Sequence, residues 1–278
     1  MLTTTLVFSA PAHKTEKGCK LVNGTRLYYE IKGEGQPIVF VHGFMLDCRM
    51  WDDQFNYFSK WYRCIRYDIR GYGLSALPGN EPYTFQEDLK SLLFSLEIRE
   101  PVILVGHSLG GRIASNFALQ YPRFTKALVL ADSQFEGYVF KGFKLDTIFR
   151  SAITKGIEYA KRKWLALELF APARRNKIVT QRIETMLRFY SGWHFVDKNP
   201  VVHFIPPTWR QLSNIALPSL IVYGVLDLPD FQEMSEGAAE KIPGAIKVVL
   251  ADTGHMSNME NPTEFNRELL DFFDSLQD

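Results

Sequence analysis

The sequence predicts an α/β protein with a mostly parallel sheet of about eight strands, helices on both faces and an inserted helical cap. Three observations support this fold class. Short β-prone runs alternate with segments long enough for crossover helices. One run ends in a glycine-rich turn that precedes a helical pattern. The stretch between residues 132 and 218 has helical patterns but no clear buried strand.

The first two β-prone runs, residues 19–22 and 25–31, are expected to form a hairpin. They flank Asn23-Gly24, and Asn-Gly is a strong signal for a two-residue hairpin turn. The later runs are mostly separated by crossover-length segments, so we expect them to pair in parallel, with the chemistry at their carboxyl ends. These runs cover residues 37–41, 62–67, 102–105, 127–130, 219–223 and 245–250.

Residues 134–213 are predicted to form the helical cap, inserted between two parts of the core, residues 1–133 and 214–278. Helix-like stretches cover residues 145–170 and 174–190. The interval carries many lysines and arginines against few acids, which predicts a locally positive surface. Either a solvated helical face or attraction to an acidic substrate, a partner or a membrane would explain that charge.

Composition excludes several classes of function. A net charge of +1 gives no overall attraction to nucleic acids or anionic membranes. The three cysteines, Cys19, Cys48 and Cys64, lack C-x-x-C spacing, so neither a disulfide framework nor a zinc site is expected. No apolar run approaches the roughly eighteen residues that span a bilayer. Residues 1–10 lack the basic start of a signal peptide, so we expect a cytoplasmic protein without a membrane anchor.

Ser108 is the candidate nucleophile. It follows the apolar run 102–105 and precedes residues 112–120, whose apolar side chains have helical spacing. A serine lifted out of a strand into a sharp turn has a strained backbone, and only very small residues fit two positions before and after it. Gly106 and Gly110 occupy those positions.

His255 is the candidate general base, because a serine hydroxyl is a poor nucleophile near neutral pH unless a base accepts its proton. His255 follows the last β-prone run, where a loop can carry its imidazole across the strand ends. The other histidines fit this role less well: His107 is held in the turn beside the serine, His42 belongs to a backbone loop, and His13, His194 and His203 lack a strand-end setting.

Asp227 is the candidate acid that orients the base, since it follows the run 219–223. Two other aspartates compete with it. Asp230 has a structural explanation, because Pro229 and Asp230 are typical of the first turn of a helix. Asp132 ends the preceding run and remains an alternative.

Two backbone amides are candidates for the oxyanion hole. The amide of Leu109 lies at the start of the predicted helix, and the amide of Phe44 follows His42-Gly43 at the neighbouring strand end. The substrate pocket is expected to involve four further side chains: Met45, His107, Trp164 and Trp193. No residue pattern calls for a metal or a cofactor.

These motifs resemble those of the α/β-hydrolase superfamily, in its group of cap-bearing serine hydrolases with esterase or lactonase activity. The resemblance spans nearly everything after residue 20, and the order Ser, Asp, His is the family's order. It implies that Asp68, Arg70 and Ser75 brace a loop near the site and that Trp51 packs against the following helix. The matching motifs are His42-Gly43-Phe44, Asp68 to Ser75, Gly106 to Gly110, Gly224 to Asp227 and Gly254-His255.

The favoured function is hydrolysis of carboxylic esters of small to medium size through an acyl-enzyme intermediate. Related dehalogenases and epoxide hydrolases have a carboxylate where this chain has Ser108, so those reactions are not expected. A lactonase or a carbon–carbon bond hydrolase would use the same triad, and a lipase would fit the basic, aromatic cap. From another class, a ligand receptor with a vestigial triad stays open. The expected partner is a small-molecule ester, and the oligomeric state is not predicted.

Overall fold

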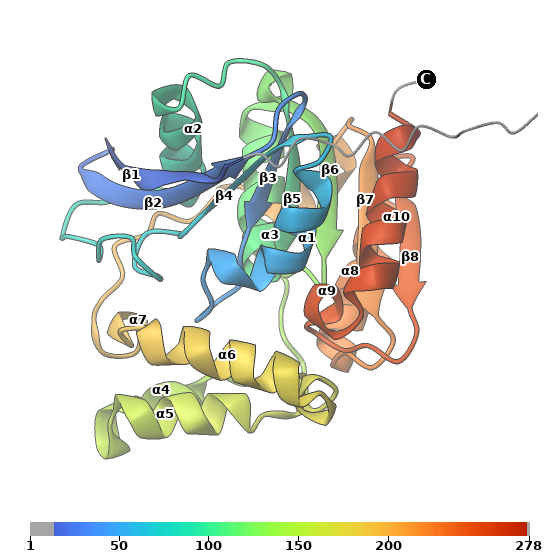
Figure 1. Cartoon of the computed structure of the whole chain (residues 1–278). Coiled ribbons are helices and arrows are strands. Elements are labelled where there is room, and N and C mark those ends of the chain that lie inside the picture. Colours follow the sequence, from blue (N-terminus) through green and yellow to red (C-terminus); the bar gives the residue numbers. More distant parts are fainter. Residues whose placement is uncertain (1–13, 277–278) are drawn as a thin grey trace, which may run out of the picture.

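An eight-stranded sheet forms the centre of the molecule in this computed structural model (Figure 1). The structure describes residues 14–276, with every side chain in that range except that of Val196, so the expectation about residues 1–10 lies outside it. The strand order is β1-β2-β4-β3-β5-β6-β7-β8. The strands are β1 (Glu16–Val22), β2 (Thr25–Lys32), β3 (Pro37–Val41), β4 (Arg63–Tyr67), β5 (Val102–His107), β6 (Thr125–Ala131), β7 (Ser219–Gly224) and β8 (Ile246–Leu250).

The predicted fold class is confirmed by the pairing of these strands. β1 and β2 form the expected hairpin, with positive φ angles at Asn23 and Gly24, as a type I′ turn requires. β2 pairs antiparallel with β4, and every later pair is parallel. All residues of β3 and β5 are buried, because helices cover both faces of a parallel sheet.

Helices cover the two faces of the sheet. α1 (Asp52–Phe58) and α10 (Pro262–Asp274) contact each other on one face, while α2 (Phe85–Ser95), α3 (Leu109–Gln120) and α8 (Pro229–Lys241) lie on the other (Figure 1). The short α9 (Ser257–Glu260) precedes α10. The described residues also contain six 3₁₀ helices: Cys48–Trp51, Pro122–Phe124, Glu168–Phe170, Ala173–Arg175, Thr208–Arg210 and Leu212–Asn214.

A separate group of helices lies beyond the carboxyl ends of the strands, between β6 and β7 (Figure 1). They are α4 (Asp146–Lys155), α5 (Ile157–Leu165), α6 (Lys177–Phe189) and α7 (Trp193–Val196). This placement supports an inserted cap, whose boundaries at residues 134 and 213 stay a prediction. The stretch 145–170 is not one helix, because Gly156 (φ +88°) ends α4 in a conformation that favours glycine.

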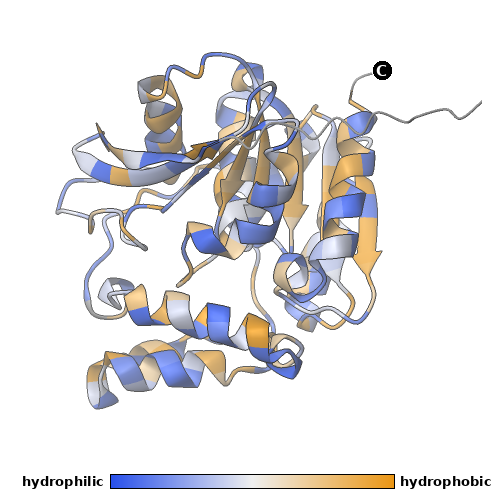
Figure 2. Ribbon diagram, in the orientation of Figure 1, coloured by the Kyte–Doolittle hydropathy of each residue, from blue (hydrophilic) through white to orange (hydrophobic). Residues whose placement is uncertain are grey.

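α6 illustrates why the cap helices form. Asn176 accepts hydrogen bonds from the amides of Ile178 and Val179 and so caps the first turn. The buried side chains of α6 recur at helical spacing and make one apolar face, and polar and apolar residues alternate along this helix in Figure 2. These buried residues are Val179, Ile183, Met186 and Leu187. No helix among residues 14–276 is both long and apolar enough to cross a membrane.

The register of the central strands brings distant motifs together. Val41 pairs with Gly106, and His107 pairs with Ala131. Gly224, the last residue of β7, pairs with Leu250 at the end of β8. The loops that begin at residues 42, 108, 132, 225 and 251 therefore leave the sheet along the same edge, which faces the cap helices.

Candidate active site

Ser108 occupies a strained turn between β5 and α3. Its backbone has φ +51° and ψ −113°, a conformation that non-glycine residues rarely adopt. The two flanking glycines are required sterically. A Cβ atom on Gly106 would lie 2.3 Å from the carbonyl oxygen of Gly110, and one on Gly110 would lie 2.1 Å from the carbonyl oxygen of Val41. The turn therefore presents Ser108 at the end of the sheet, as its sequence setting predicts.

His255 and Asp227 form a buried pair beside this turn. His255 Nδ1 lies 2.8 Å from Asp227 Oδ2, and the other carboxylate oxygen accepts a hydrogen bond of 2.6 Å from the amide of Leu228. Burial lowers the pKa of His255 to about 3, so its imidazole is neutral near pH 7. Because the Nδ1–H group of His255 donates a hydrogen bond to Asp227, Nε2 of the neutral ring carries no proton and can accept one.

The two competing aspartates have other roles. Asp132 Oδ1 accepts a 2.9 Å hydrogen bond from the amide of Gly224, and Oδ2 accepts one from the hydroxyl of Ser257. Asp132 thus braces the loops that carry Asp227 and His255 and makes no hydrogen bond to His255. Burial, and then the charge of the nearby Asp227, raise the pKa of Asp132, and burial also raises the pKa of Asp227.

Asp230 ties the cap to the core. Its carboxylate accepts hydrogen bonds of 2.7, 2.8 and 2.7 Å from the amides of Lys141, Gly142 and Phe143. These backbone contacts outweigh the effect of burial and lower the pKa of Asp230. The residue also lies in the first turn of α8, as its sequence setting predicted.

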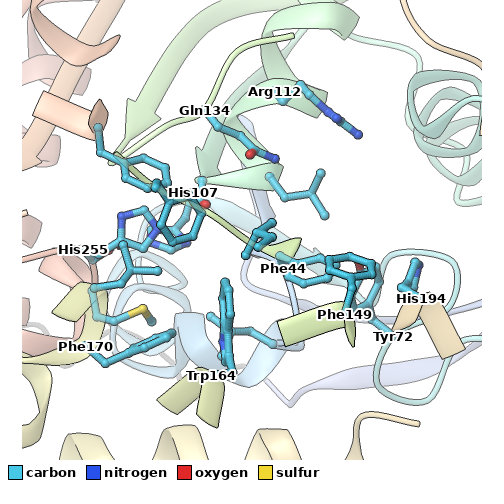
Figure 3. Close-up of a pocket in the computed structure, with 18 of the residues that line it drawn as sticks. Phe44, Tyr72, His107, Arg112, Gln134, Phe149, Trp164, Phe170, His194 and His255 are labelled. Carbon is cyan, nitrogen blue, oxygen red and sulfur yellow. The ribbon is translucent and has the colours of Figure 1, made fainter. Parts of the chain in front are cut away.

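A cavity of about 300 Å³ lies over the strand ends and includes both Ser108 and His255. No hydrogen bond joins the Ser108 hydroxyl to the His255 ring among the described residues. Such contacts are often long without substrate and tighten once it binds. The walls are mostly apolar, with many aromatic side chains, and come from both core and cap (Figure 3). They include Phe44, Tyr72, Phe143, Phe149, Trp164 and Phe170.

Two unpaired amides are available to the same cavity. Phe44 and Leu109 both line it, and within residues 14–276 neither backbone N–H donates a hydrogen bond. His42 holds the loop that carries Phe44, because its Nε2 accepts from the amide of Ile69 at 2.9 Å while Nδ1 donates to the carbonyl of Gly43 at 2.9 Å. Burial lowers the pKa of His42 to about 4, which keeps this ring neutral.

Two of the four predicted pocket residues line the cavity. Trp164 packs edge-on against Phe44, with ring centroids 5.7 Å apart. His107 also lines the cavity, but its Nε2 donates a 2.6 Å hydrogen bond to the carbonyl of His255 and so holds the loop of the candidate base.

The prediction was wrong for Met45 and Trp193, neither of which reaches the cavity. Met45 (φ +63°) has no exposed surface and packs into the hydrophobic core. Trp193 begins α7, where successive side chains point about 100° apart, and its neighbour His194 faces the cavity instead.

Sequence reasoning missed several residues of the cavity. His194 has no strand-end setting in the sequence, yet it stacks on Tyr72 with ring centroids 4.4 Å apart. Nothing in the sequence indicated this contact, because the cap places it. Arg112 and Gln134 also line the cavity. Arg112 lies in the first turn of the helix predicted after Ser108, and its nearness to Ser108 in the sequence was an available signal.

The loop after β4 is braced as the resemblance implied. Ser75 donates to the carbonyl of Asp68, and Arg70 pairs with Asp88 at 2.7 Å. Trp51 has no exposed surface and packs against Phe40 and against Phe265 of α10, so it is a core residue.

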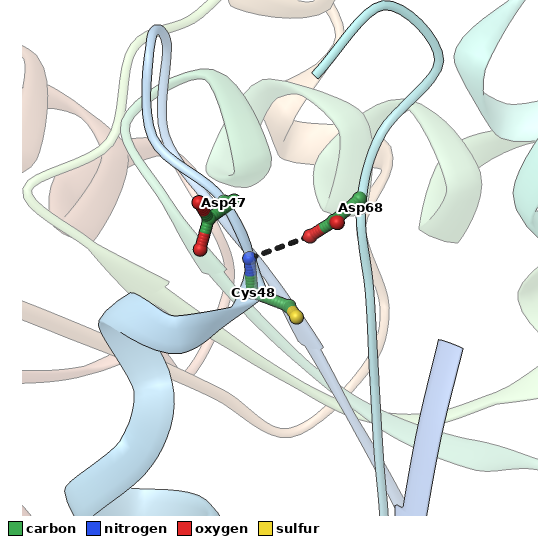
Figure 4. A group of neighbouring side chains, drawn as sticks. All are labelled: Asp47, Cys48 and Asp68. Carbon is green, nitrogen blue, oxygen red and sulfur yellow. Dashed lines mark hydrogen bonds between the residues drawn. The ribbon is translucent and has the colours of Figure 1, made fainter. Parts of the chain in front are cut away.

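Asp47, Cys48 and Asp68 bring potential metal ligands within 4.8 Å of one another (Figure 4). The carboxylate oxygens that could bind a metal already have partners in the protein. The Asp68 oxygens accept hydrogen bonds from the amides of Cys48 and Leu74, and Asp47 pairs with Arg49. Burial raises the pKa of the Cys48 thiol well above its usual range, which disfavours the thiolate that a metal would need. The group serves to hold the loops together.

Comparisons with known proteins agree with the fold. Residues 36–262 match the family described as "alpha/beta hydrolase fold". The chain is 25% identical to an (E)-2-((N-methylformamido)methylene)succinate hydrolase of Acinetobacter baylyi over 91% of this chain and 96% of that protein. It is 27% identical to a non-heme chloroperoxidase of Kitasatospora aureofaciens, over 91% and 98% of the two chains. Among solved structures, the enol-lactonase from Burkholderia xenovorans superimposes with a TM-score of 0.78 at 24% identity, over 92% and 100% of the chains.

Proposed function

The chain belongs to the α/β-hydrolase fold family, and we propose that it is a serine hydrolase that cleaves carboxylic ester bonds of small to medium substrates. One observation carries the proposal. A buried, neutral His255 is held by Asp227 at 2.8 Å, in a cavity where Ser108 stands on a strained turn. Strain of this kind persists where it serves a function, and a binding protein has no need of all three groups.

The proposed reaction has two steps. The Ser108 oxygen attacks the ester carbonyl while His255 Nε2 takes the hydroxyl proton, and Asp227 stabilises the imidazolium that forms. The amides of Phe44 and Leu109 stabilise the negative charge on the carbonyl oxygen. The alcohol leaves with the proton from His255. Water then attacks the acyl-enzyme by the same route, releases the acid and restores Ser108.

An ester substrate suits the cavity, because its aromatic walls would bind the apolar parts of a small molecule. The names of the relatives include a hydrolase of a succinate derivative and a chloroperoxidase, so the shared scaffold supports more than one reaction. Lactone and carbon–carbon bond cleavage would use the same groups and are the alternatives that a substrate panel must separate.

A fluorophosphonate probe tests the proposal directly. The protein should be labelled at one site, with the adduct on the peptide that contains Ser108, and should turn over p-nitrophenyl esters. Ser108→Ala should lose both labelling and turnover while it keeps its circular dichroism spectrum and melting temperature. Ser95→Ala is the matched control, since the Ser95 hydroxyl only caps a carbonyl near the end of α2. A folded protein that the probe does not label would favour a receptor role.

A further inference from the structure

One formal charge faces the candidate active-site cavity, and it belongs to Arg112. Among the described residues that line the cavity, Arg112 is the one lysine or arginine, and no aspartate or glutamate is present. Three histidines also line it. Burial lowers the pKa of His107, His194 and His255, so these rings are neutral near pH 7. The inner surface of the cavity is therefore positive at a single place.

The Arg112 guanidinium has no carboxylate partner. Within residues 14–276 it makes no hydrogen bond or ion pair. Its one aromatic contact is with Phe85, whose ring centroid lies 5.9 Å from the Arg112 Cζ atom. Two buried arginines of this protein, in contrast, each have a carboxylate partner. Arg66 pairs with Glu30 at 2.6 Å, and Arg70 pairs with Asp88 at 2.7 Å. A half-buried guanidinium has five N–H donors, which here are left for solvent or a ligand.

Gln134 lines the same cavity as Arg112, and its side chain is also unpaired within the described residues. Figure 3 shows Arg112 and Gln134 along one side of the cavity, directed the same way. Both residues are anchored to the candidate nucleophile. The backbone amides of Arg112 and Gln134 each donate a 3.2 Å hydrogen bond to the carbonyl oxygen of Ser108. The two side chains therefore start from fixed positions relative to the Ser108 hydroxyl.

We propose that Arg112, assisted by Gln134, binds a carboxylate on the substrate, so that the enzyme prefers esters carrying a free carboxylate a few bonds from the scissile carbonyl. This inference rests on the proposed function and adds the substrate class. A guanidinium matches a planar carboxylate with two parallel hydrogen bonds. One cation balances one such group, whereas a phosphate dianion would leave excess negative charge against aromatic walls.

The expected preference for a substrate carboxylate follows from how each substrate affects the positive charge of Arg112. A neutral ester of the same shape would exclude water from Arg112 and offer it no counter-charge, whereas a carboxylate would pair with it. Arg112 lies in the first turn of α3, the helix that begins directly after Ser108, and both residues line the same cavity. Because the Arg112 side chain is flexible, its position does not fix how many bonds separate the substrate carboxylate from the scissile carbonyl. Substrates of different chain length measure that separation.

The experiment compares two matched series of methyl esters. The first contains monomethyl esters of straight-chain dicarboxylic acids from succinic to suberic acid. The second contains methyl esters of monocarboxylic acids of the same lengths. A supplementary set, the acetate esters of hydroxy acids, places the carboxylate on the alcohol side of the ester bond. The wild-type protein should hydrolyse one half-ester with a kcat/KM about 100-fold above that of its neutral counterpart. Equal or faster hydrolysis of every neutral ester would overturn the inference.

Variants assign the preference to Arg112. Arg112→Gln should reduce kcat/KM for the favoured half-ester about 100-fold and change hydrolysis of the neutral esters by less than about threefold. Arg112→Lys should recover part of the loss, because it restores the charge without the planar fork. Arg123→Gln removes one positive charge from an exposed site outside the cavity and should leave both series unchanged. An unchanged ratio in Arg112→Gln would contradict the assignment.

A binding measurement separates this inference from the proposed function. Ser108→Ala cannot form an acyl-enzyme but keeps the cavity, so at least one half-ester should bind it more tightly than the neutral methyl ester of the same length does. If the wild-type protein hydrolyses neither series while this binding difference is present, the proposed function fails and the carboxylate site stands. If neutral esters are hydrolysed through Ser108 without any preference, the carboxylate site fails and the hydrolase stands.

Discussion

Asp227 holds the His255 imidazole through a hydrogen bond of 2.8 Å, although the two residues are 28 positions apart. Neither side chain has more than 4% of its surface exposed. Because one oxygen of Asp227 is held by the amide of Leu228, the other faces His255 in a defined direction. This contact selects the tautomer in which Nε2 can accept a proton.

Replacing Asp227 by Asn should therefore reduce kcat for a p-nitrophenyl ester by about 10³- to 10⁴-fold with little change in fold, because an amide can stabilise the wrong tautomer. Asp132→Asn is the matched comparison, since Asp132 is equally buried but contacts Gly224 and Ser257. It should cost less activity. A larger loss in Asp132→Asn than in Asp227→Asn would reassign the acid.

The pH profile of kcat/KM reports the ionisation of the base in the free enzyme. Burial lowers the pKa of His255 to about 3, so the neutral ring that catalysis requires persists as the pH falls below the usual imidazole value. We expect the acidic limb of the profile to lie below pH 6, about half a unit or more under the ordinary histidine pKa. A limb at pH 7 or above, measured with a neutral ester, would contradict this.

Folding stability should also fall in acid because of buried histidines. Burial lowers the pKa of His194 to about 4, whereas in the unfolded chain it returns to about 6.5. The unfolded state then binds more protons between these values, so stability is fully present above about pH 6.5 and is lost as the pH falls toward 4. His194→Phe keeps the ring that stacks on Tyr72 and should flatten the dependence of the melting temperature on pH in this window.

That effect has an internal control. Trp193 precedes His194 in α7 and carries no group that titrates in this range, so Trp193→Phe should leave the slope between pH 4 and 6.5 close to that of the wild type. Equal slopes in the wild type and His194→Phe would show that His194 does not carry the effect.

Gly106→Ala should destabilise the protein by about 1–3 kcal/mol or more, because the added Cβ would lie 2.3 Å from a backbone oxygen that cannot move freely. Urea unfolding measures the loss. Gly79→Ala is the control, since a Cβ atom at that position would have no other atom within 4 Å. Similar stability of the two variants would mean that the turn at Ser108 does not need glycine at position 106.

Asp230→Ala should loosen the connection to the cap, because it leaves the amides of Lys141, Gly142 and Phe143 without their acceptor. Limited proteolysis should cut faster within residues 134–213, and the Ser108 peptide should still take up a fluorophosphonate. Glu233→Ala removes an exposed contact of the same segment, the ion pair with Lys141, and should change the cleavage rate little. Equal cleavage of the two variants would contradict the anchoring role.

Much of the fold could be predicted because its signals are local. Alternating apolar runs indicated all eight strands within a few residues of their observed bounds, and Asn23-Gly24 marked the hairpin. The predicted helical stretch 145–170 contains a break that the sequence pattern did not indicate, since the pattern of apolar side chains continues across Gly156 while the helical backbone does not. Periodicity detects a buried face, and it detects a break in the helix less well.

The candidate site could be predicted less completely. The placement of Asp227 agrees with the sequence argument, but its distinction from Asp132 depended on hydrogen bonds between loops. Met45 adjoins Phe44 in sequence and yet is a core residue, because the turn directs its side chain away from the cavity. His194 enters the site from α7, which no local pattern connects to Ser108.

By itself, the sequence determined the order of strands and helices and the strained turn at Ser108, because side-chain periodicity and the steric need for Gly106 and Gly110 act between close neighbours in the chain. Only the tertiary structure decided which aspartate meets His255, that Asp230 anchors the cap, and that Arg112 faces the cavity without a counter-charge. These outcomes depend on distances and burial among segments far apart in sequence, and such quantities exist only once the chain has packed.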